Sequence, residues 1–374
     1  MQLHLQFDKH AWIERAKRMF AGFDRPLALI VFLLLCVGIV TLYSASLDMP
    51  GRVEDQLRNI MLTFGLMWVL ANIPPQTLMR FAVPAYVVGL AFLVAVALFG
   101  DVVNGARRWL HVGVTRFQPS EMMKLALPLM LAWYFHRKES GVRLRDFVLA
   151  ALLVAVPVAL IARQPDLGTA ALVAAAGFYV IFFAGISWRV LIVVTVLGTA
   201  SIYPLWNHLH DYQKKRVLTL LDPTTDPLGA GYHIIQSTIA VGSGGISGKG
   251  WLNGTQSHLE FIPERHTDFI FAVFSEEFGL IGNAVLIVLY ALLIGRGLVI
   301  ASGAATIFAR LMAGAIALMF FTYAFVNMGM VSGILPVVGV PLPFLSYGGT
   351  ALLTLFIGAG ILMSVQRHRK LVQT

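Results

Sequence analysis

Ten long apolar segments constrain the fold of this 374-residue chain more than any other feature of its sequence. A helix needs about 20 mostly apolar residues to cross a hydrocarbon layer about 30 Å thick. Charged residues make up only 13% of the chain, against roughly 25% in a soluble domain. The apolar segments cover residues 26–46, 57–73, 81–100, 119–135, 147–163, 167–184, 187–206, 268–294, 306–330 and 347–366.

This pattern predicts an all-α integral membrane protein with about ten transmembrane helices. We expect an N-terminal tail (1–25), a membrane domain (26–366) and a C-terminal tail (367–374). Residues 207–267, between the seventh and eighth spans, form the one large hydrophilic loop. No small-residue cleavage site follows the basic N-terminal tail, so we expect the tail to be retained. The single cysteine, Cys36, lies within the first span, where we expect a small buried hydrophobic side chain.

The distribution of Lys and Arg predicts how the chain is oriented in the membrane. Ten spans place both termini on one side, and that side carries 16 of the 28 basic residues. Eleven lie on the opposite side, and Lys124 lies within a span. We therefore expect both termini in the cytoplasm and the loop 207–267 outside it. The net charge of +9 then reflects topology, and nucleic acid is not an expected partner.

The segment 100–118 is basic although it falls on the side with fewer basic residues. It contains Arg107 and Arg108, followed by Trp109. Solvation of a loop would account for these charges. Guanidinium groups at a membrane surface also suit an anion site, because each can bind phosphate through two hydrogen bonds. Trp109 suits an anchor at the membrane interface under either interpretation.

Ionisable residues inside or beside the apolar segments are further candidate site residues. Glu121 and Lys124 lie three positions apart, on one face of the fourth span. Charges at this depth are costly, so they form either a structural ion pair or the lining of a polar substrate cavity. Asp166 follows Arg163 in the short connection between the fifth and sixth spans. It is either part of a charged helix hairpin or a substrate-binding residue.

The loop 207–267 contains a glycine-rich run, GSGGISGKGWLNG, that invites comparison with a phosphate loop. A phosphate loop requires Gly five residues before the Gly-Lys pair and Ser or Thr after it. Ser243 and Gly250 stand at those positions, so ATP binding is not expected. The histidines of the loop lack the spacing of a dedicated zinc site. No cofactor is evident from these residues.

Asp268 stands at the junction between this polar loop and the eighth apolar segment. At the start of a helix its carboxylate would accept hydrogen bonds from backbone N–H groups and interact favourably with the macrodipole. That environment would keep it ionised, as a general base must be. Glu276 and Glu277 lie about 12 Å deeper by helical rise, and two adjacent carboxylates at that depth need partners or water. Asp268 is therefore either a helix cap or a catalytic residue.

Five motifs occur in order along the chain: NGARRW, FQPSE followed by Lys124, QPDLGT, FIPERHTDFIFAVFSEEFGLIG and GVPLPFLSYGGT. Together they resemble the SEDS family (shape, elongation, division and sporulation), and the resemblance covers nearly the whole chain. The stretch ERHTDFIFA, with Arg265 and Thr267, is similar to the elongation branch, of RodA type. The division branch, of FtsW type, more usually carries Asn before the aspartate.

The resemblance implies a peptidoglycan glycosyltransferase that polymerises lipid II at the outer face of the bacterial cytoplasmic membrane. It implies that Asp268 deprotonates the 4-hydroxyl of the acceptor sugar, which attacks the donor and expels undecaprenyl diphosphate. Glycosidases need two carboxylates because their leaving group must be protonated, whereas a diphosphate leaves as a stable anion. Positive charge for that anion would come from Arg107, Arg108, Lys124 or a divalent metal ion.

Further contacts with the substrate are our own expectation. We expect Glu121, Asp166 and Arg265 to bind substrate, and apolar grooves between the spans to hold polyprenyl tails. The implied partner is a class B penicillin-binding protein, which cross-links the glycan. A lipid II flippase would also use intramembrane charges and a polar cavity. A division-type paralogue would share the chemistry, and a non-catalytic scaffold would need neither Asp268 nor the charged pair.

Overall fold

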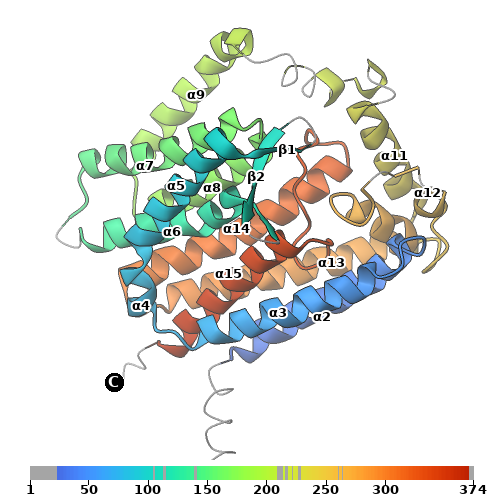
Figure 1. The fold of residues 1–374 in the computed structure, drawn as a ribbon, viewed down its shortest axis with the longest axis horizontal. Coiled ribbons are helices and arrows are strands. Elements are labelled where there is room, and N and C mark those ends of the chain that lie inside the picture. The colour runs from blue at the N-terminus through green and yellow to red at the C-terminus, as the bar shows by residue number, and fades with distance from the viewer. Residues whose placement is uncertain are drawn as a thin grey trace, which may run out of the picture.

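Ten helices follow the ten predicted spans in the part of the chain that the computed structural model describes (Figure 1). That part comprises residues 23–103, 106–112, 115–138, 141–208, 214, 218–220, 222–225, 229–259, 261–262 and 264–369. The ten helices are α2 (Arg25–Ala45), α3 (Arg52–Ala71), α5 (Ala82–Phe99), α6 (Pro119–His136), α7 (Leu144–Arg163), α8 (Leu167–Phe183), α9 (Trp188–His208), α13 (Ile270–Ser302), α14 (Ile307–Val331) and α15 (Gly349–Arg367).

The length and hydropathy of these helices fit a membrane protein. Six of them (α2, α5, α7, α13, α14 and α15) are long and apolar enough to cross a membrane, judged by length and composition. Helix α8 and the first part of α9, Trp188–Ser201, are shorter apolar helices. The prediction of a helical integral membrane protein is confirmed.

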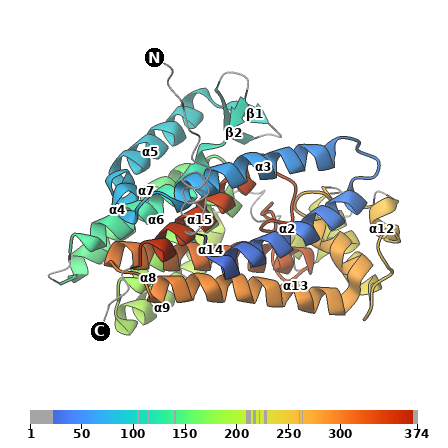
Figure 2. The same ribbon diagram turned by 90° about the horizontal axis from the view of Figure 1, so that it is seen from below.

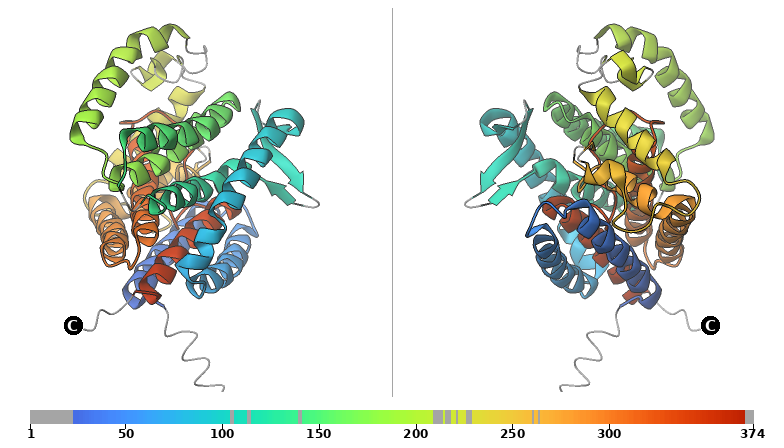
Figure 3. Two further views of the ribbon diagram at one scale, coloured as in Figure 1. Left: turned by 90° about the vertical axis from the view of Figure 1, so that its left-hand side faces the viewer. Right: turned by 90° about the vertical axis from the view of Figure 1, so that its right-hand side faces the viewer.

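A small antiparallel sheet occupies the segment in which the sequence indicated only a basic loop. Its strands are β1 (Asp101–Val103), β2 (Ala106–Val112) and β3 (Thr115–Phe117), in the order β1-β2-β3. The sheet lies beside α5 and extends from one side of the helical bundle (Figure 3). Strand β2, which contains Arg108, therefore lies at the edge of the bundle.

The hydrophilic loop also contains structure that the sequence analysis did not predict. A 3-10 helix, η1 (Pro223–Thr225), and two α-helices, α11 (Ala230–Ser243) and α12 (Thr255–His258), lie within it. One further short helix, α4 (Pro75–Arg80), precedes α5.

Helix α14 is the centre of the bundle. It packs against α6, α8, α13 and α15, while α2 lies along α13 and α3 along α15 (Figures 1 and 2). Successive helices run in opposite directions, so α6, α8, α13 and α15 all begin at the same end of the bundle. Helix α3 begins there too, so that end collects the N-termini of five helices, four of which border the cavity described below.

The predicted burial of Cys36 is wrong. Its side chain is exposed on α2, on the face that also exposes Phe32 and Leu33. In a membrane the outer face of a helix meets lipid tails, which are as apolar as a protein core. A small thiol is therefore stable on that face without being buried.

The glycine-rich run packs against a break in α13. Gly279 has φ 63° and ψ −160°, which interrupts the helical hydrogen bonds there. The loop replaces them: Lys249 N donates to Glu276 O at 3.0 Å, and Leu280 N donates to Gly245 O at 2.9 Å. The glycines are required for this approach, because a Cβ on Gly248 would lie 2.0 Å from Glu277 O.

The two adjacent carboxylates near this break both accept hydrogen bonds, although Glu277 Oε2 has no partner among the described residues. The fully buried Glu276 accepts hydrogen bonds from Lys249 Nζ at 2.6 Å and from Gln256 N at 3.0 Å. Glu277 accepts a hydrogen bond from the Ser44 hydroxyl at the end of α2. These contacts attach the loop 207–267 and α2 to the first turns of α13.

Candidate active site

A polar cavity of about 240 Å³ lies where α6, α8, α13 and α15 begin. Five of the seven residues proposed from the sequence as catalytic or substrate-binding line it: Arg108, Glu121, Lys124, Asp166 and Asp268. They come from four separate parts of the chain, and the fold brings them to one chamber. The remaining lining residues are Trp109, Gln118, Thr169, Leu172, Thr267, Gly339, Val340, Pro341, Tyr347, Thr350 and Ala351.

Arg108 and Asp166 form the wall on the α8 side. The Arg108 side chain donates to Pro165 O at 2.6 Å, and its Nε lies 4.0 Å from Asp166 Oδ2. Asp166 is the N-cap of α8, where Oδ1 accepts from Thr169 N at 3.1 Å. Asp166 is therefore fixed as a helix cap in the cavity wall. The Arg108 side chain also lines the cavity and is 32% exposed.

Glu121 and Lys124 form a buried ion pair on α6, with Lys124 Nζ 2.6 Å from Glu121 Oε1. Lys124 also donates to the Tyr323 hydroxyl at 2.7 Å. Thr354 on α15 donates to Glu121 Oε2 at 3.3 Å. Burial of such a pair is tolerable only when further hydrogen bonds complete it. The pair is thus well satisfied, and both of its members also line the polar cavity.

Asp268 is a half-buried carboxylate at the cavity wall, one residue before the Phe269 N-cap of α13. The predicted capping role is wrong, because no side chain caps this helix. Within the described residues no donor contacts the Asp268 carboxylate. Desolvation by the surrounding protein, and secondarily the nearby charge of Glu264, raise its pKa from 3.8 to about 6. Burial has outweighed the favourable effect expected from the helix end.

The helix N-termini at this end add positive potential to the chamber. Gln118 and Asp166, which line the cavity, are the N-caps of α6 and α8. Asp268 and Thr350, also in the lining, flank the starts of α13 and α15. The N-terminus of a helix carries a partial positive charge on its free N–H groups. Together with Arg108 and Lys124, this arrangement favours an anionic ligand.

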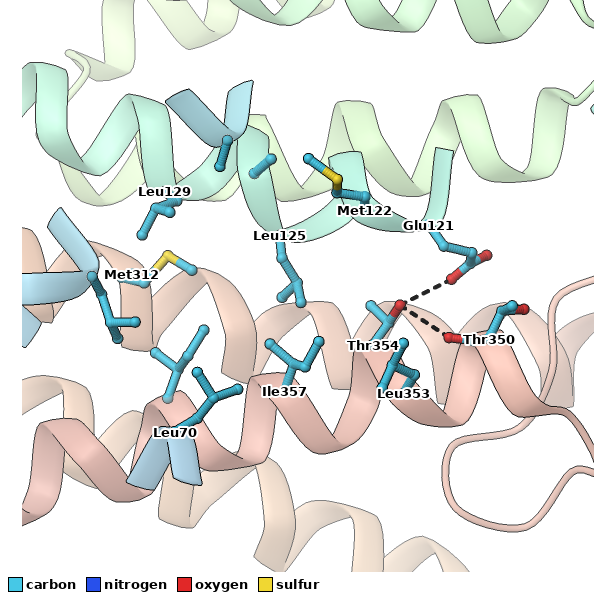
Figure 4. Close-up of a pocket in the computed structure, with 14 residues that line it drawn as sticks. Leu70, Glu121, Met122, Leu125, Leu129, Met312, Thr350, Leu353, Thr354 and Ile357 are labelled. Carbon is cyan, nitrogen blue, oxygen red and sulfur yellow. Dashed lines mark hydrogen bonds between the residues drawn. The ribbon is translucent and has the colours of Figure 1, made fainter. Parts of the chain in front are cut away.

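An apolar cavity of about 350 Å³ adjoins the polar one, and Glu121 and Thr350 line both. Figure 4 shows Glu121, Thr350 and Thr354 gathered at one end of it, with aliphatic side chains and Met312 along the rest. A ligand with a charged head and an apolar tail could therefore occupy both spaces. The apolar side chains are Leu70, Leu78, Ala85, Met122, Leu125, Ala126, Leu129, Met312, Leu353, Ile357 and Ile361.

Two residues proposed from the sequence are not among the described cavity lining. Arg265 is buried outside the lining, where its Nε donates to Ala45 O at 2.8 Å and its Nη2 contacts Asp48. The side chain of Arg107 lies outside the described part of the structure. Among the described residues, no group of three or more His, Cys, Asp or Glu side chains is arranged to hold a metal ion.

Sequence reasoning did not single out Tyr323 or Thr354, which complete the Glu121–Lys124 pair. Both lie on apolar helices, where a lone hydroxyl is a weak signal. It also missed Asn327 of α14, which is fully buried. An amide inside an apolar helix needs hydrogen-bond partners, and this requirement was the available clue.

The fold and the site define a multi-pass helical membrane protein with a polar chamber at one end and an apolar cavity beside it. The sequence pattern of the "Cell cycle protein" family of FtsW, RodA and SpoVE matches residues 25–371. The chain therefore belongs to this family.

Individual relatives agree with this assignment. The chain is 53% identical over 350 residues to the peptidoglycan glycosyltransferase MrdB of Escherichia coli (strain K12), covering 93% of this chain and 95% of the relative. A chain from a solved structure described as "Structural coordination of polymerization and crosslinking by a peptidoglycan synthase complex" matches with a TM-score of 0.80 and 36% identity. That match covers 93% of this chain and 99% of the other.

The crystal structure of the Thermus thermophilus rod shape determining protein RodA is also similar. It matches with a TM-score of 0.70 and 30% identity, covering 93% of this chain and 97% of that one. The similarity to these solved structures therefore extends over nearly the whole membrane domain.

Proposed function

We propose that this chain is a peptidoglycan glycosyltransferase that polymerises lipid II during cell elongation, with Asp268 as its general base. The assignment of the base rests on the surroundings of the Asp268 carboxylate and on its lack of a described hydrogen-bond donor. It faces a chamber bordered by Arg108 and Lys124, and no described residue donates to it. The 53% identity to MrdB, against 34% to a division-type relative of Geobacter sulfurreducens, supports the elongation branch.

The proposed reaction uses one carboxylate. Asp268 takes the proton of the acceptor 4-hydroxyl, and the oxygen attacks the anomeric carbon of the donor. The bond between that carbon and the diphosphate breaks, and the electron pair leaves on the diphosphate. A pKa of about 6 leaves Asp268 mostly ionised at neutral pH, yet more basic than an ordinary carboxylate. The proton therefore has an acceptor inside the chamber.

The developing charge on the diphosphate is the second requirement of the reaction. Arg108 and Lys124 line the chamber, and four helix N-termini meet there. Preorganised positive groups at the leaving group stabilise the transition state. A divalent metal ion carried by the diphosphate would share this task. Glu121 and Asp166 act mainly by holding Lys124 and the wall of α8 in place.

The substrate tail and the partner are proposed on separate grounds. The apolar cavity that shares Glu121 and Thr350 with the chamber suits a polyprenyl tail. In this proposal the chamber faces the outside of the cytoplasmic membrane and both termini lie in the cytoplasm, as the distribution of Lys and Arg predicts. Similarity to a chain of a complex described as coordinating polymerisation and cross-linking supports a class B penicillin-binding protein as partner.

The test compares polymerisation with lipid transport. The purified chain, together with a penicillin-binding protein whose transpeptidase is inactivated, is supplied with lipid II, and glycan chains are resolved by electrophoresis. We expect glycan ladders with the wild type and none with Asp268→Ala. Absence of ladders with the wild type, while lipid II is still scrambled in liposomes, would contradict the proposal and favour a flippase.

A further inference from the structure

Three consecutive backbone carbonyls, those of His266, Thr267 and Asp268, are each held by a donor from the α14–α15 region. Tyr347 N donates to His266 O at 2.9 Å, and Ser346 Oγ donates to Thr267 O at 2.7 Å. The third donor comes from within α14. The backbone that presents Asp268 is therefore held in place by the residues before α15.

Asn327 is that third donor. Its side chain is fully buried, and its Nδ2 donates to Asp268 O at 2.8 Å and to Val340 O at 2.7 Å. Both acceptors are carbonyl oxygens, so the amide orientation is fixed and both of its N–H groups are used. Asp268 and Val340 line the same cavity. One amide thus joins two walls of the chamber.

We propose that Asn327 is a positioning residue for the reaction, which fixes the Asp268 carboxylate relative to the wall at Val340. This inference rests on the proposed function and goes beyond it by assigning a role to α14 and to the motif GVPLPFLSYGGT. Ser346 acts in the same direction, since its hydroxyl donates to Thr267 O and accepts from Leu342 N at 2.7 Å.

The chemistry explains why an amide stands at this position. Two carbonyls from different segments need two N–H donors on one atom, and an Asn side chain supplies them. Leu has nearly the same size and supplies neither donor. A ~1 Å displacement of a catalytic group can cost about 100-fold in rate. Loss of this bridge should therefore act on the chemical step rather than on lipid binding.

The experiment measures kcat, KM and the pH dependence of kcat/KM for lipid II polymerisation. It uses the full-length chain with its transpeptidase-inactive partner. The variants are Asn327→Leu and Ser346→Ala, with rates expressed per folded molecule. The control is Tyr86→Phe. It removes another bond from a side chain to a backbone carbonyl, Tyr86 Oη to Leu153 O at 2.7 Å, which joins α5 and α7 outside the chamber lining.

We expect Asn327→Leu to lower kcat about 100-fold and to leave KM within about twofold. Ser346→Ala should change kcat in the same direction by a smaller factor. The acidic half-point of kcat/KM is expected near pH 6 in the wild type, because burial raises the pKa of Asp268 to about 6. In the variants it should move to lower pH as water reaches the freed carboxylate. The charged groups facing Asp268 stay in place in all variants: Glu264 on its own loop, and Arg108, Glu121, Lys124 and Asp166 in the chamber.

Wild-type kcat per folded molecule in both variants would overturn the inference. An unchanged acidic half-point alongside a reduced kcat would do the same, because a merely structural bond does not alter the carboxylate. If Asn327→Leu does not fold, Ser346→Ala decides. Failure of the wild type to make glycan would contradict the proposed function itself, and the inference with it. Variants that match an active wild type in kcat would remove this inference alone and leave the proposed function standing.

Discussion

Gly339 lies so close to Asp268 that a Cβ at Gly339 would stand 3.2 Å from the Asp268 Oδ2 atom. Gly339 also has φ +72°, a conformation that costs little only for glycine. The backbone of Gly339 therefore leaves space directly beside the carboxylate. In the proposed mechanism this space admits the acceptor hydroxyl.

Substitution of Gly339 tests whether the acceptor hydroxyl occupies the space beside the Asp268 carboxylate. Gly339→Ala should reduce kcat by at least tenfold, because the added methyl group crowds the carboxylate and strains the backbone by about 1–3 kcal/mol. Gly185→Ala provides the control, since Gly185 also has positive φ, at +93°, but has no atom within 4 Å of an added Cβ. Equal activity of the two variants would contradict the proposed position of the acceptor.

The buried pair on α6 offers a second test, which separates stability from activity. Lys124→Met or Glu121→Gln alone leaves one buried charge or donor without its partner, at a cost of about 3–5 kcal/mol. The double variant should recover much of this loss in thermal unfolding. It should not recover polymerisation, because Lys124 lines the chamber. Recovery of activity in the double variant would show that the pair is purely structural.

The role of Arg265 can be tested by comparing the effect of a substitution on KM for lipid II with its effect on the free energy of unfolding. The Nε and Nη2 of Arg265 reach two different acceptors, Ala45 O and Asp48, and a lysine, with its single nitrogen, cannot match this geometry. Arg265→Lys should therefore lower the free energy of unfolding by about 1–3 kcal/mol and leave KM for lipid II within about twofold. A tenfold increase in KM at unchanged stability would instead support the substrate-binding role that the sequence indicated.

The packing of the glycine-rich run predicts which of its glycines can be replaced by alanine. Gly248→Ala should destabilise the fold by about 2–5 kcal/mol, through overlap with Glu277 O and strain at φ +80°. Gly242→Ala, in α11, meets no atom within 4 Å and should be neutral or slightly stabilising. Thermal unfolding of the purified variants measures both. A neutral Gly248→Ala would show that the loop does not pack tightly on α13.

The helices were the most predictable part of this fold, because each crosses a layer that only an apolar run can cross. Errors arose where polar residues extend a helix. Helix α3 begins at Arg52 rather than 57, and α13 continues to Ser302 rather than 294. Arg296, which hydropathy placed in a loop, lies inside α13 and pairs with Asp24 at the start of α2.

The candidate site was predictable in its residue types but not in its geometry. Buried charges such as Lys124 and Asp268 stand out in an apolar sequence, and both line the chamber. The sequence did not predict the convergence of four helix N-termini, which depends on how the spans pack. Nor did it indicate that Arg265 faces α2, since only the tertiary structure brings Asp48 to it.

The central claim is that Asp268 is the general base, and the pH dependence of kcat/KM for lipid II tests it most directly. The carboxylate must be ionised to accept a proton, and burial has raised its pKa to about 6. Activity should therefore be full near neutral pH and fall tenfold per pH unit below about pH 6. Asp268→Asn should lose activity at every pH, by about 100- to 10,000-fold. A wild-type rate that stays constant down to pH 4.5, or an Asn variant with the wild-type profile, would contradict the account.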